Sequence, residues 1–257
     1  MPPRRALRIF ALVYALILGT VTACQPPVGS SAGSGASQAN QSPKRVTAVV
    51  MGELNALNAK VNTSMATIGQ RGQDEAERLV NSGLTVLDAQ GARHPQLADQ
   101  FPTSENGLWQ IFPDGHMVTT WKLHPGAHWH DGVPFTTDDI VFTYQLVKDR
   151  DLATFHIATS DYVQSLDAPD PLTLTVTWTA PTILADDLFS NSGSGGNPAA
   201  SSLLPRHLLE RPYLDNRDSF FELPYWNLEF VGTGPFKLRE FARSSYVRLT
   251  ANDDFVL

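Results

Sequence analysis

The stretch WKLHPGAHWHDGVPFTTDDIVFTYQLV, residues 121–147, predicts a strand, two turns and a helix in succession. Trp121 and Leu123 alternate with polar residues, as in a strand that buries one face. Two turn-forming pairs come next, Pro125-Gly126 and Asp131-Gly132. Thr136 then occupies a helix N-cap position, because two aspartates follow it where carboxylates meet the positive end of the helix dipole. The helix is expected to bury one apolar stripe, made of Ile140, Val141, Tyr144 and Val147.

This unit resembles the signature of the extracytoplasmic solute-binding proteins of ABC importers, in the family often called family 5, the peptide and oligopeptide binders. The family pattern is F-x-L-R-x-G-x-x-F/W-x-D-G-x-P-x-T-A-x-D-V, and a helix follows it. The matching positions are Trp121, Leu123, Gly126, Trp129, Asp131, Gly132, Pro134, Thr136 and Asp139, with Ile140 in place of valine. His124 stands where arginine is usual, and Thr137 where alanine is usual. A match of this length and spacing is far more specific than a short motif.

Further segments resemble the same family in the expected order. HPQLADQF at 94–101 resembles P-x-L-A-x-x-W/F, GTGPF at 232–236 is a second landmark, and ANDDF at 251–255 resembles x-N-x-x-Y/F. The resemblance implies an α/β fold, namely a class II periplasmic-binding-protein-like lobe with a mixed sheet and an inserted hairpin-rich subdomain at about 84–180. Members of the family continue into a second lobe. We therefore expect this chain to be the N-terminal portion, with a lobe that is incomplete without the C-terminal one.

Composition places the chain among ordinary soluble globular proteins. It has 257 residues, of which 42% are hydrophobic and 18% charged, and its formal net charge is −7. The first 23 residues hold three arginines and no acid, so the charge without them would be −10. An acidic chain without a basic cluster argues against nucleic acid as a partner.

The N-terminus predicts a lipoprotein signal. Three arginines precede a short apolar run, and Val-Thr-Ala-Cys then ends at Cys24, the single cysteine of the sequence. This ending resembles the bacterial lipobox, in which the cysteine is lipidated and becomes the new N-terminus. A plain secretory signal or an uncleaved anchor is the alternative. We expect a signal peptide at 1–23, a flexible Ser/Gly/Pro linker at 24–44 and a folded region at 45–257.

Hydrophobic periodicity predicts further elements on both sides of the quoted stretch. Two single strands are expected, at 46–51, buried on both faces, and at 84–87. Strands 108–112 and 116–124 are expected to form a hairpin around Asp114-Gly115, and 162–166 to pair with the alternating run 172–178. A last hairpin is expected at 236–250. The expected helices are 73–82 with Gly83 as C-cap, 181–188 and 203–210, whereas 52–67 is expected to be a loop.

Three histidines in the quoted stretch raise the possibility of a metal site. Together with Asp131 they form H-x₃-H-x-H-D (His124, His128, His130), and in an extended segment His128 and His130 would share one face. Imidazole groups in such a cluster can bind zinc, which would make the chain a secreted metal-dependent hydrolase. The alternative is that they are solvated side chains on a scaffold strand. On that interpretation we expect no metal site, no cofactor and no catalytic residue, and the sequence also lacks the G-x-S-x-G of a serine hydrolase.

Ligand binding needs no reactive side chain, because the backbone groups of loops can hold a peptide. By resemblance, one side of the ligand cleft would be formed by the loop after the first strand, and a later loop is a second candidate. The candidate ligand-binding residues are Asn62, Thr63 and Ser64 in the first loop and Phe189, Ser190 and Asn191 in the second. Ordinary surface loops are the alternative for both, and Trp226 and GTGPF would lie near the hinge.

The resemblance implies the substrate-binding component of an ABC importer, a monomer held to the cell membrane by its lipidated cysteine in the periplasmic space or at the cell surface. It would capture peptides and deliver them to permease subunits, which distinguish the ligand-bound form. Another solute, such as a metal complex, a haem or a sugar, is the alternative within the family. Outside the family, the alternatives are the metal-dependent hydrolase using His124, His128 and His130 and a structural lipoprotein without a ligand.

Overall fold

The computed structural model describes residues 44–65, 72–191 and 203–256. The chain divides into two compact units, Met1–Thr47 and Ala48–Leu257. All helices and strands named below belong to the second unit. The predicted signal peptide at 1–23, Cys24 and the linker up to residue 43 lie outside the described residues. Within the described ranges, no helix combines the length and the apolarity needed to span a bilayer.

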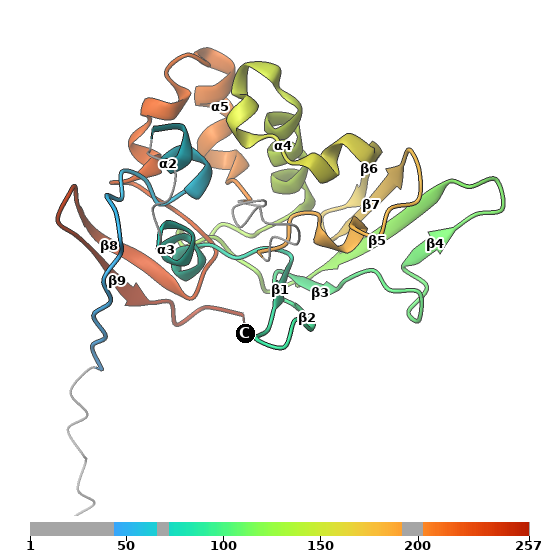
Figure 1. Cartoon of the computed structure of the whole chain (residues 1–257), viewed down its shortest axis with the longest axis horizontal. Helices are drawn as coiled ribbons and strands as arrows, with labels where there is room; N and C mark the ends of the chain where they lie inside the picture. The colour runs from blue at the N-terminus through green and yellow to red at the C-terminus, as the bar shows by residue number, and fades with distance from the viewer. Residues whose placement is uncertain (1–43, 66–71, 192–202, 257) are drawn as a thin grey trace, which may run out of the picture. The chain divides into compact units, whose positions relative to one another are not determined.

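Five strands form the main sheet, in the order β3-β5-β7-β6 with β4 also paired to β5 (Figure 1). Their bounds are Ala98–Gln100 for β3, Trp109–Ile111 for β4, Met117–Leu123 for β5, Val163–Asp170 for β6 and Thr173–Trp178 for β7. The predicted hairpin around Asp114-Gly115 is confirmed as β4–β5, and the predicted pairing of 162–166 with 172–178 is confirmed as β6–β7. All strand pairs over the described residues are antiparallel.

Strand β5 lies at the centre of this sheet. Its side chains alternate between buried and partly buried, as the sequence predicts, and Trp121 is fully buried. Trp121 pairs with Leu174 of β7 and Thr119 pairs with Val176, so both strands direct apolar side chains into the same core. The indole Nε1–H of Trp178 donates to Thr119 Oγ1 at 2.9 Å, which satisfies both buried polar groups.

Helix α4 (Thr137–Lys148) begins where the sequence predicts, directly after Thr136. The Thr136 backbone N–H donates to Asp139 Oδ2 at 3.0 Å, which satisfies a donor that the helix itself cannot pair. The two aspartates of the first turn also lie at the positive end of the helix dipole. Local sequence signals therefore fix the start of this helix.

The predicted single apolar stripe of α4 is incomplete, because the helix is buried on two sides. Ile140 and Val147 pack into the first hydrophobic cluster, which lies against the main sheet. Phe142 and Leu146 pack into a second cluster on another side of the helix. Figure 1 shows α4 beside helix α5 (Arg206–Asp215), which contributes to this second cluster.

The second cluster is rich in aromatic rings. The Trp226 ring lies 5.7 Å from the Phe155 ring and 5.4 Å from the Phe220 ring, measured between centroids. The Trp226 indole Nε1–H donates to the Phe220 carbonyl at 2.6 Å, and the Leu57 backbone N–H donates to the Trp226 carbonyl at 2.7 Å. The segment before helix α2 is therefore anchored on this cluster.

The remaining elements flank the two clusters. They are α2 (Ala59–Met65), α3 (Gln73–Val80), β1 (Thr85–Leu87), β2 (Arg93–Pro95), β8 (Phe236–Ala242) and β9 (Tyr246–Ala251). Short 3-10 helices span Arg150–Phe155 (η1), Ala158–Tyr162 (η2), Ala185–Asp187 (η3), Phe220–Glu222 (η4) and Pro224–Trp226 (η5). The pairing of β8 with β9 confirms the last predicted hairpin, and α3 confirms the helix predicted at 73–82, although it ends at Val80.

Several predicted elements are wrong. The strand expected at 46–51 does not form, and Val49 is 91% exposed, because an apolar run is buried only where strands cover its faces. The loop expected at 52–67 contains α2, and only the short η3 forms within 181–188. The helix expected at 203–210 is confirmed as α5, although it begins at Arg206, after its N-cap Pro205.

Candidate ligand-binding site

Asn62 closes the turn that precedes it in the chain. Its Oδ1 accepts from the backbone N–H groups of Asn55 at 3.1 Å and Ala56 at 2.9 Å, and its Nδ2 donates to the Ala56 carbonyl at 2.6 Å. The side chain is 1% exposed, so its polar groups are used within the protein. Thr63 and Ser64 follow in α2, but their side chains lie outside what the structure describes.

Helix α3 holds this first segment through a buried carboxylate. Glu77 accepts from the backbone N–H of Ala59 at 2.8 Å and from Asn58 Nδ2 at 3.3 Å, at the N-terminus of α2. A carboxylate is stabilising there, because the first N–H groups of a helix lack partners within it. Burial lowers the pKa of the neighbouring Lys60, and the negative charge of Glu77 opposes this shift.

The second candidate segment runs along the start of β1. The Leu84 N–H donates to the Phe189 carbonyl at 2.7 Å, and the Asn191 N–H donates to the Thr85 carbonyl at 2.8 Å. Ser190 Oγ also donates to the Thr85 carbonyl, at 3.2 Å. Phe189 has a positive φ of 56° although its side chain is fully buried, so the fold holds a conformation that L-residues avoid.

Gly83 permits this close approach. A Cβ atom at this position would lie 2.4 Å from the Asn191 nitrogen and 2.8 Å from the Phe189 oxygen. The sequence predicts Gly83 as the C-cap of α3, but that helix ends earlier with Asn81 as its C-cap. The glycine is therefore needed for contact between two backbones rather than for helix termination.

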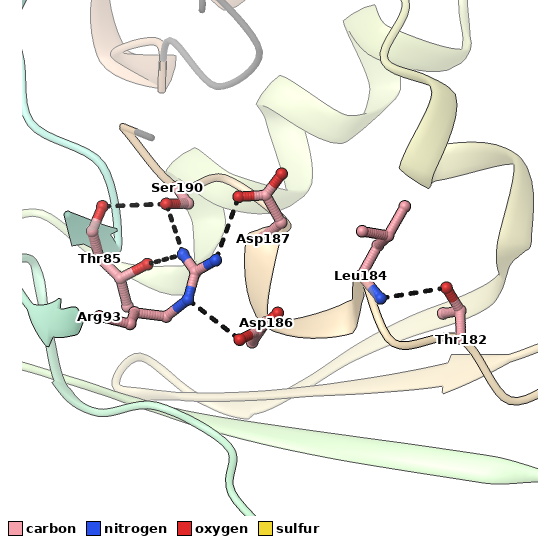
Figure 2. A network of polar contacts seen from close by, with 7 residues as sticks. All are labelled: Thr85, Arg93, Thr182, Leu184, Asp186, Asp187 and Ser190. Carbon is pink, nitrogen blue, oxygen red and sulfur yellow. Dashed lines mark hydrogen bonds and ion pairs between the residues drawn. The ribbon is translucent and has the colours of Figure 1, made fainter. Parts of the chain in front are cut away.

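Arg93 of β2, the strand paired with β1, also binds the second segment (Figure 2). Its Nη1 donates to Thr85 Oγ1 and to Ser190 Oγ, both at 2.8 Å. Its Nε lies 3.0 Å from Asp186 Oδ2, and its Nη2 lies 3.3 Å from Asp187 Oδ1. The guanidinium is the kind of planar fork that can satisfy several acceptors at once. Sequence reasoning missed this residue, because its partners are far apart in the chain.

The structure attaches the two candidate segments to the same helix, one turn apart. The first segment bonds to Glu77, and Asn191 Nδ2 of the second donates to the Asn81 carbonyl at 3.0 Å. The side chains of Asn62, Phe189 and Ser190 are buried and shape the backbone. The Asn191 side chain is half-buried, and its backbone N–H is bonded within the protein, to Thr85.

The three histidines do not converge on one point. His124 Nδ1 accepts from the Gly126 N–H at 3.0 Å, and His128 Nδ1 lies 2.5 Å from the Gly126 carbonyl. His130 instead contacts the GTGPF segment. Among the described residues, no group of three or more His, Cys, Asp or Glu side chains could hold a metal ion. The metal-dependent hydrolase therefore has no ligand set in this part of the chain.

His130 joins the two sequence landmarks. Its Nδ1 accepts from the Gly232 N–H at 3.2 Å, and its Nε2 lies 3.1 Å from the Gly234 carbonyl. Since a carbonyl accepts only, Nε2 carries the proton and the imidazole is neutral. The landmark is also bonded to the end of α3, because Thr233 Oγ1 accepts from the Ser82 N–H at 3.1 Å and donates to Asn81 Oδ1 at 3.0 Å.

Acid is expected to destabilise the protein through His130. Burial lowers its pKa below 6.5, and Lys237 adds to this, while the Gly234 carbonyl and Asp131 act in the opposite direction. The unfolded chain therefore binds the proton first, and stability falls as the pH drops below about 6.5. Urea midpoints measured between about pH 7.5 and 5 should fall less steeply for His130→Gln than for the wild type. His128→Gln is the control, and an unchanged slope in His130→Gln would contradict the prediction.

Comparison with known proteins identifies a family and several relatives that are similar to this chain. The family model of bacterial extracellular solute-binding proteins, family 5, middle, matches residues 94–256. A protein of Brucella ovis, named provisionally as an ABC transporter peptide-binding protein, is 29% identical over 147 residues, which cover 57% of this chain and 25% of the relative. The oligopeptide-binding protein AppA of Bacillus subtilis is 28% identical over 145 residues, which cover 55% and 24%. The chain thus spans about a quarter of the length of the curated relatives it matches.

Solved structures share the fold. AppA in complex with a nonapeptide superposes with a TM-score of 0.58 and 22% identity, over 80% of this chain and 36% of AppA. NikZ of Campylobacter jejuni, in complex with Ni(L-His), superposes with a TM-score of 0.59 and 25% identity, over 81% of this chain and 35% of NikZ. The predicted α/β, periplasmic-binding-protein-like fold is confirmed.

Proposed function

Because the chain belongs to the bacterial extracellular solute-binding proteins of family 5, we propose that it is the substrate-binding component of an ABC importer. In this role it captures peptides outside the cytoplasmic membrane and delivers them to permease subunits. The family match over residues 94–256 carries the proposal, and two relatives named for peptide binding support the class of ligand. No step of this function requires a catalytic residue.

The proposed ligand contacts come from the two segments attached to α3. Asn62, Phe189 and Ser190 give the backbone its shape, and Thr63, Ser64 and Asn191 complete the two candidate sets. Backbone N–H and C=O groups can hold an extended peptide without regard to its side chains. Such contacts suit a receptor that accepts peptides of varied sequence.

We also propose that Cys24 anchors the protein to the membrane as a lipoprotein. The support is the sequence alone, which places a small-residue tripeptide before a single cysteine and a polar linker after it. Cells fed with labelled palmitate should label the wild-type protein and leave Cys24→Ser unlabelled. Label in the Cys24→Ser protein would contradict the anchor without bearing on ligand binding.

Peptide titration of the full-length protein tests the proposed function. We expect saturable changes in tryptophan fluorescence with penta- and nonapeptides of mixed sequence, accompanied by intact peptide at the end of the titration. An amino acid mixture of the same composition is the control. A protein that hydrolyses the peptides, or that shows no saturable response to them, would contradict the proposal.

A nickel–histidine chelate is the second ligand to test, since the 25%-identical NikZ was solved with Ni(L-His). Titration with this chelate, with free Ni²⁺ and L-histidine as separate controls, decides between the two solute classes. A response to the chelate and none to peptides would assign the protein to metal-complex uptake.

A further inference from the structure

We propose that Arg93 is the positioning residue that holds segment 185–191 in its ligand-ready conformation. This inference rests on the proposed function, because it concerns the second of the two segments that would contact the ligand. Arg93 itself is not placed among the contacting residues. Its side chain is 10% exposed, and its donors are directed at Thr85 and at the segment itself.

The first argument is the conformation of Phe189. Its φ of 56° lies in the left-handed region, a conformation that is sterically unfavourable for an L-residue. A strained residue persists only where its surroundings over-determine it. Here the Phe189 side chain is fully buried, and its carbonyl accepts from the Leu84 N–H at 2.7 Å.

The second argument is that Arg93 binds residues that come before and after Phe189 in the chain; Figure 2 shows its contacts with Asp187 and Ser190. It contacts Asp187 two positions before Phe189, at 3.3 Å, and Ser190 one position after it, at 2.8 Å. The same guanidinium donates to Thr85 of β1. The Arg93 side chain therefore links the segment to β1 through residues before and after Phe189, the residue whose backbone conformation is strained.

The third argument is charge. Asp186 and Asp187 are adjacent, and their side chains are 30% and 7% exposed. The structure places the Arg93 guanidinium against both carboxylates, at 3.0 Å and 3.3 Å. A cation opposite two neighbouring carboxylates offsets their mutual repulsion. Lysine at this position would keep the charge but would lose the fork that reaches several acceptors.

Release of the segment has a predictable effect on affinity. If relaxation of Phe189 recovers about 1.4 kcal/mol, only about a tenth of the molecules keep the ligand-ready form. The apparent Kd then rises about tenfold, because it scales with the inverse of the competent fraction. A residue that merely adds stability would leave the affinity of the folded protein unchanged.

The test compares the full-length wild type with Arg93→Lys, using penta- and nonapeptides as ligands. We expect a Kd about tenfold higher in Arg93→Lys. The amide hydrogens of Ser190 and Asn191, which bond to Asp187 and Thr85 in this structure, should exchange faster in the variant. The matched control is Arg211→Lys, because Arg211 pairs with Asp215 on the surface and is 85% exposed.

A second variant separates positioning from stability. Arg93→Met combined with Asp186→Asn and Asp187→Asn removes the cation and both carboxylates, so no uncompensated charge remains at this site. We expect its thermal stability to lie closer to wild type than that of Arg93→Met alone, with the Kd still raised. The inference would be overturned if the triple variant recovered both wild-type stability and the wild-type Kd. It would also be overturned if Arg93→Lys left the Kd and the amide exchange rates unchanged. Absence of saturable binding in the wild type would instead contradict the proposed function.

Discussion

Replacement of Gly232 by alanine is expected to cost the protein about 3 kcal/mol or more of its free energy of unfolding, which is the upper range for overpacking. The added Cβ would lie 2.0 Å from the Val80 carbonyl oxygen, which is backbone at the end of α3. The atom cannot be accommodated by rotation of a side chain. Gly234→Ala should behave similarly, because its Cβ would lie 2.5 Å from the Val80 carbonyl carbon and 2.6 Å from the Asn81 nitrogen.

Urea denaturation of the full-length protein, followed by tryptophan fluorescence, measures this effect. Gly115→Ala at the β4–β5 turn is the matched control, because the substitution is the same and a Cβ there meets nothing within 4 Å. Its φ of 88° should still make the alanine cost roughly 1–2 kcal/mol. Equal losses in Gly232→Ala and Gly115→Ala would show that the end of α3 moves aside without cost.

Asp139→Ala is expected to destabilise the protein by about 3 kcal/mol or more, because it leaves one buried and two partly buried donors without their acceptor. The carboxylate accepts from Trp129 Nε1 at 3.2 Å, from the Thr136 N–H at 3.0 Å and from the Arg206 N–H at 3.0 Å. It thus joins the segment before α4, the start of α4 and the start of α5. Burial raises the pKa of Asp139, and these hydrogen bonds oppose the shift.

Asp138→Ala provides the comparison for Asp139→Ala in the same denaturation measurement. Asp138 is the adjacent residue, its side chain is 66% exposed, and it pairs with Arg206 at 2.9 Å. An exposed ion pair of this kind contributes roughly 0.2–1 kcal/mol. Similar losses for both variants would contradict the role assigned to the buried carboxylate.

The elements with strong local signals were predictable from the sequence. The start of α4 follows from Thr136 and the aspartates after it, and β4–β5 follows from Asp114-Gly115 between alternating residues. The resemblance carried by residues 121–147 also predicted the family, which the match over 94–256 confirms. In each case neighbours in the chain determine the structure.

The wrong predictions concern segments whose structure depends on distant residues. Helix α2 has no acidic residue in its first turn, and its N-terminus is stabilised by Glu77 from another helix. The apolar run at 46–51 has the composition of a buried strand, but burial depends on strands elsewhere that would cover it. Neither dependence is visible in a local pattern.

The contacts of the candidate segments could not be predicted from the sequence, and their role in ligand binding stays a prediction. The sequence predicts Asn62 and Ser190 as polar loop residues, whereas in the structure both are buried and their side chains bond to backbone carbonyls. Arg93 and His130 organise their surroundings through partners about 90 to 100 positions away in the chain. A single sequence contains no periodicity that reports such pairs.

Helix α4 contributes side chains to both hydrophobic clusters, with Ile140 in one and Phe142 in the other. Neither cluster can lose this helix without exposing part of the other. Thermal unfolding of Ala48–Leu257 is therefore expected to be one cooperative transition, because α4 couples the two hydrophobic clusters.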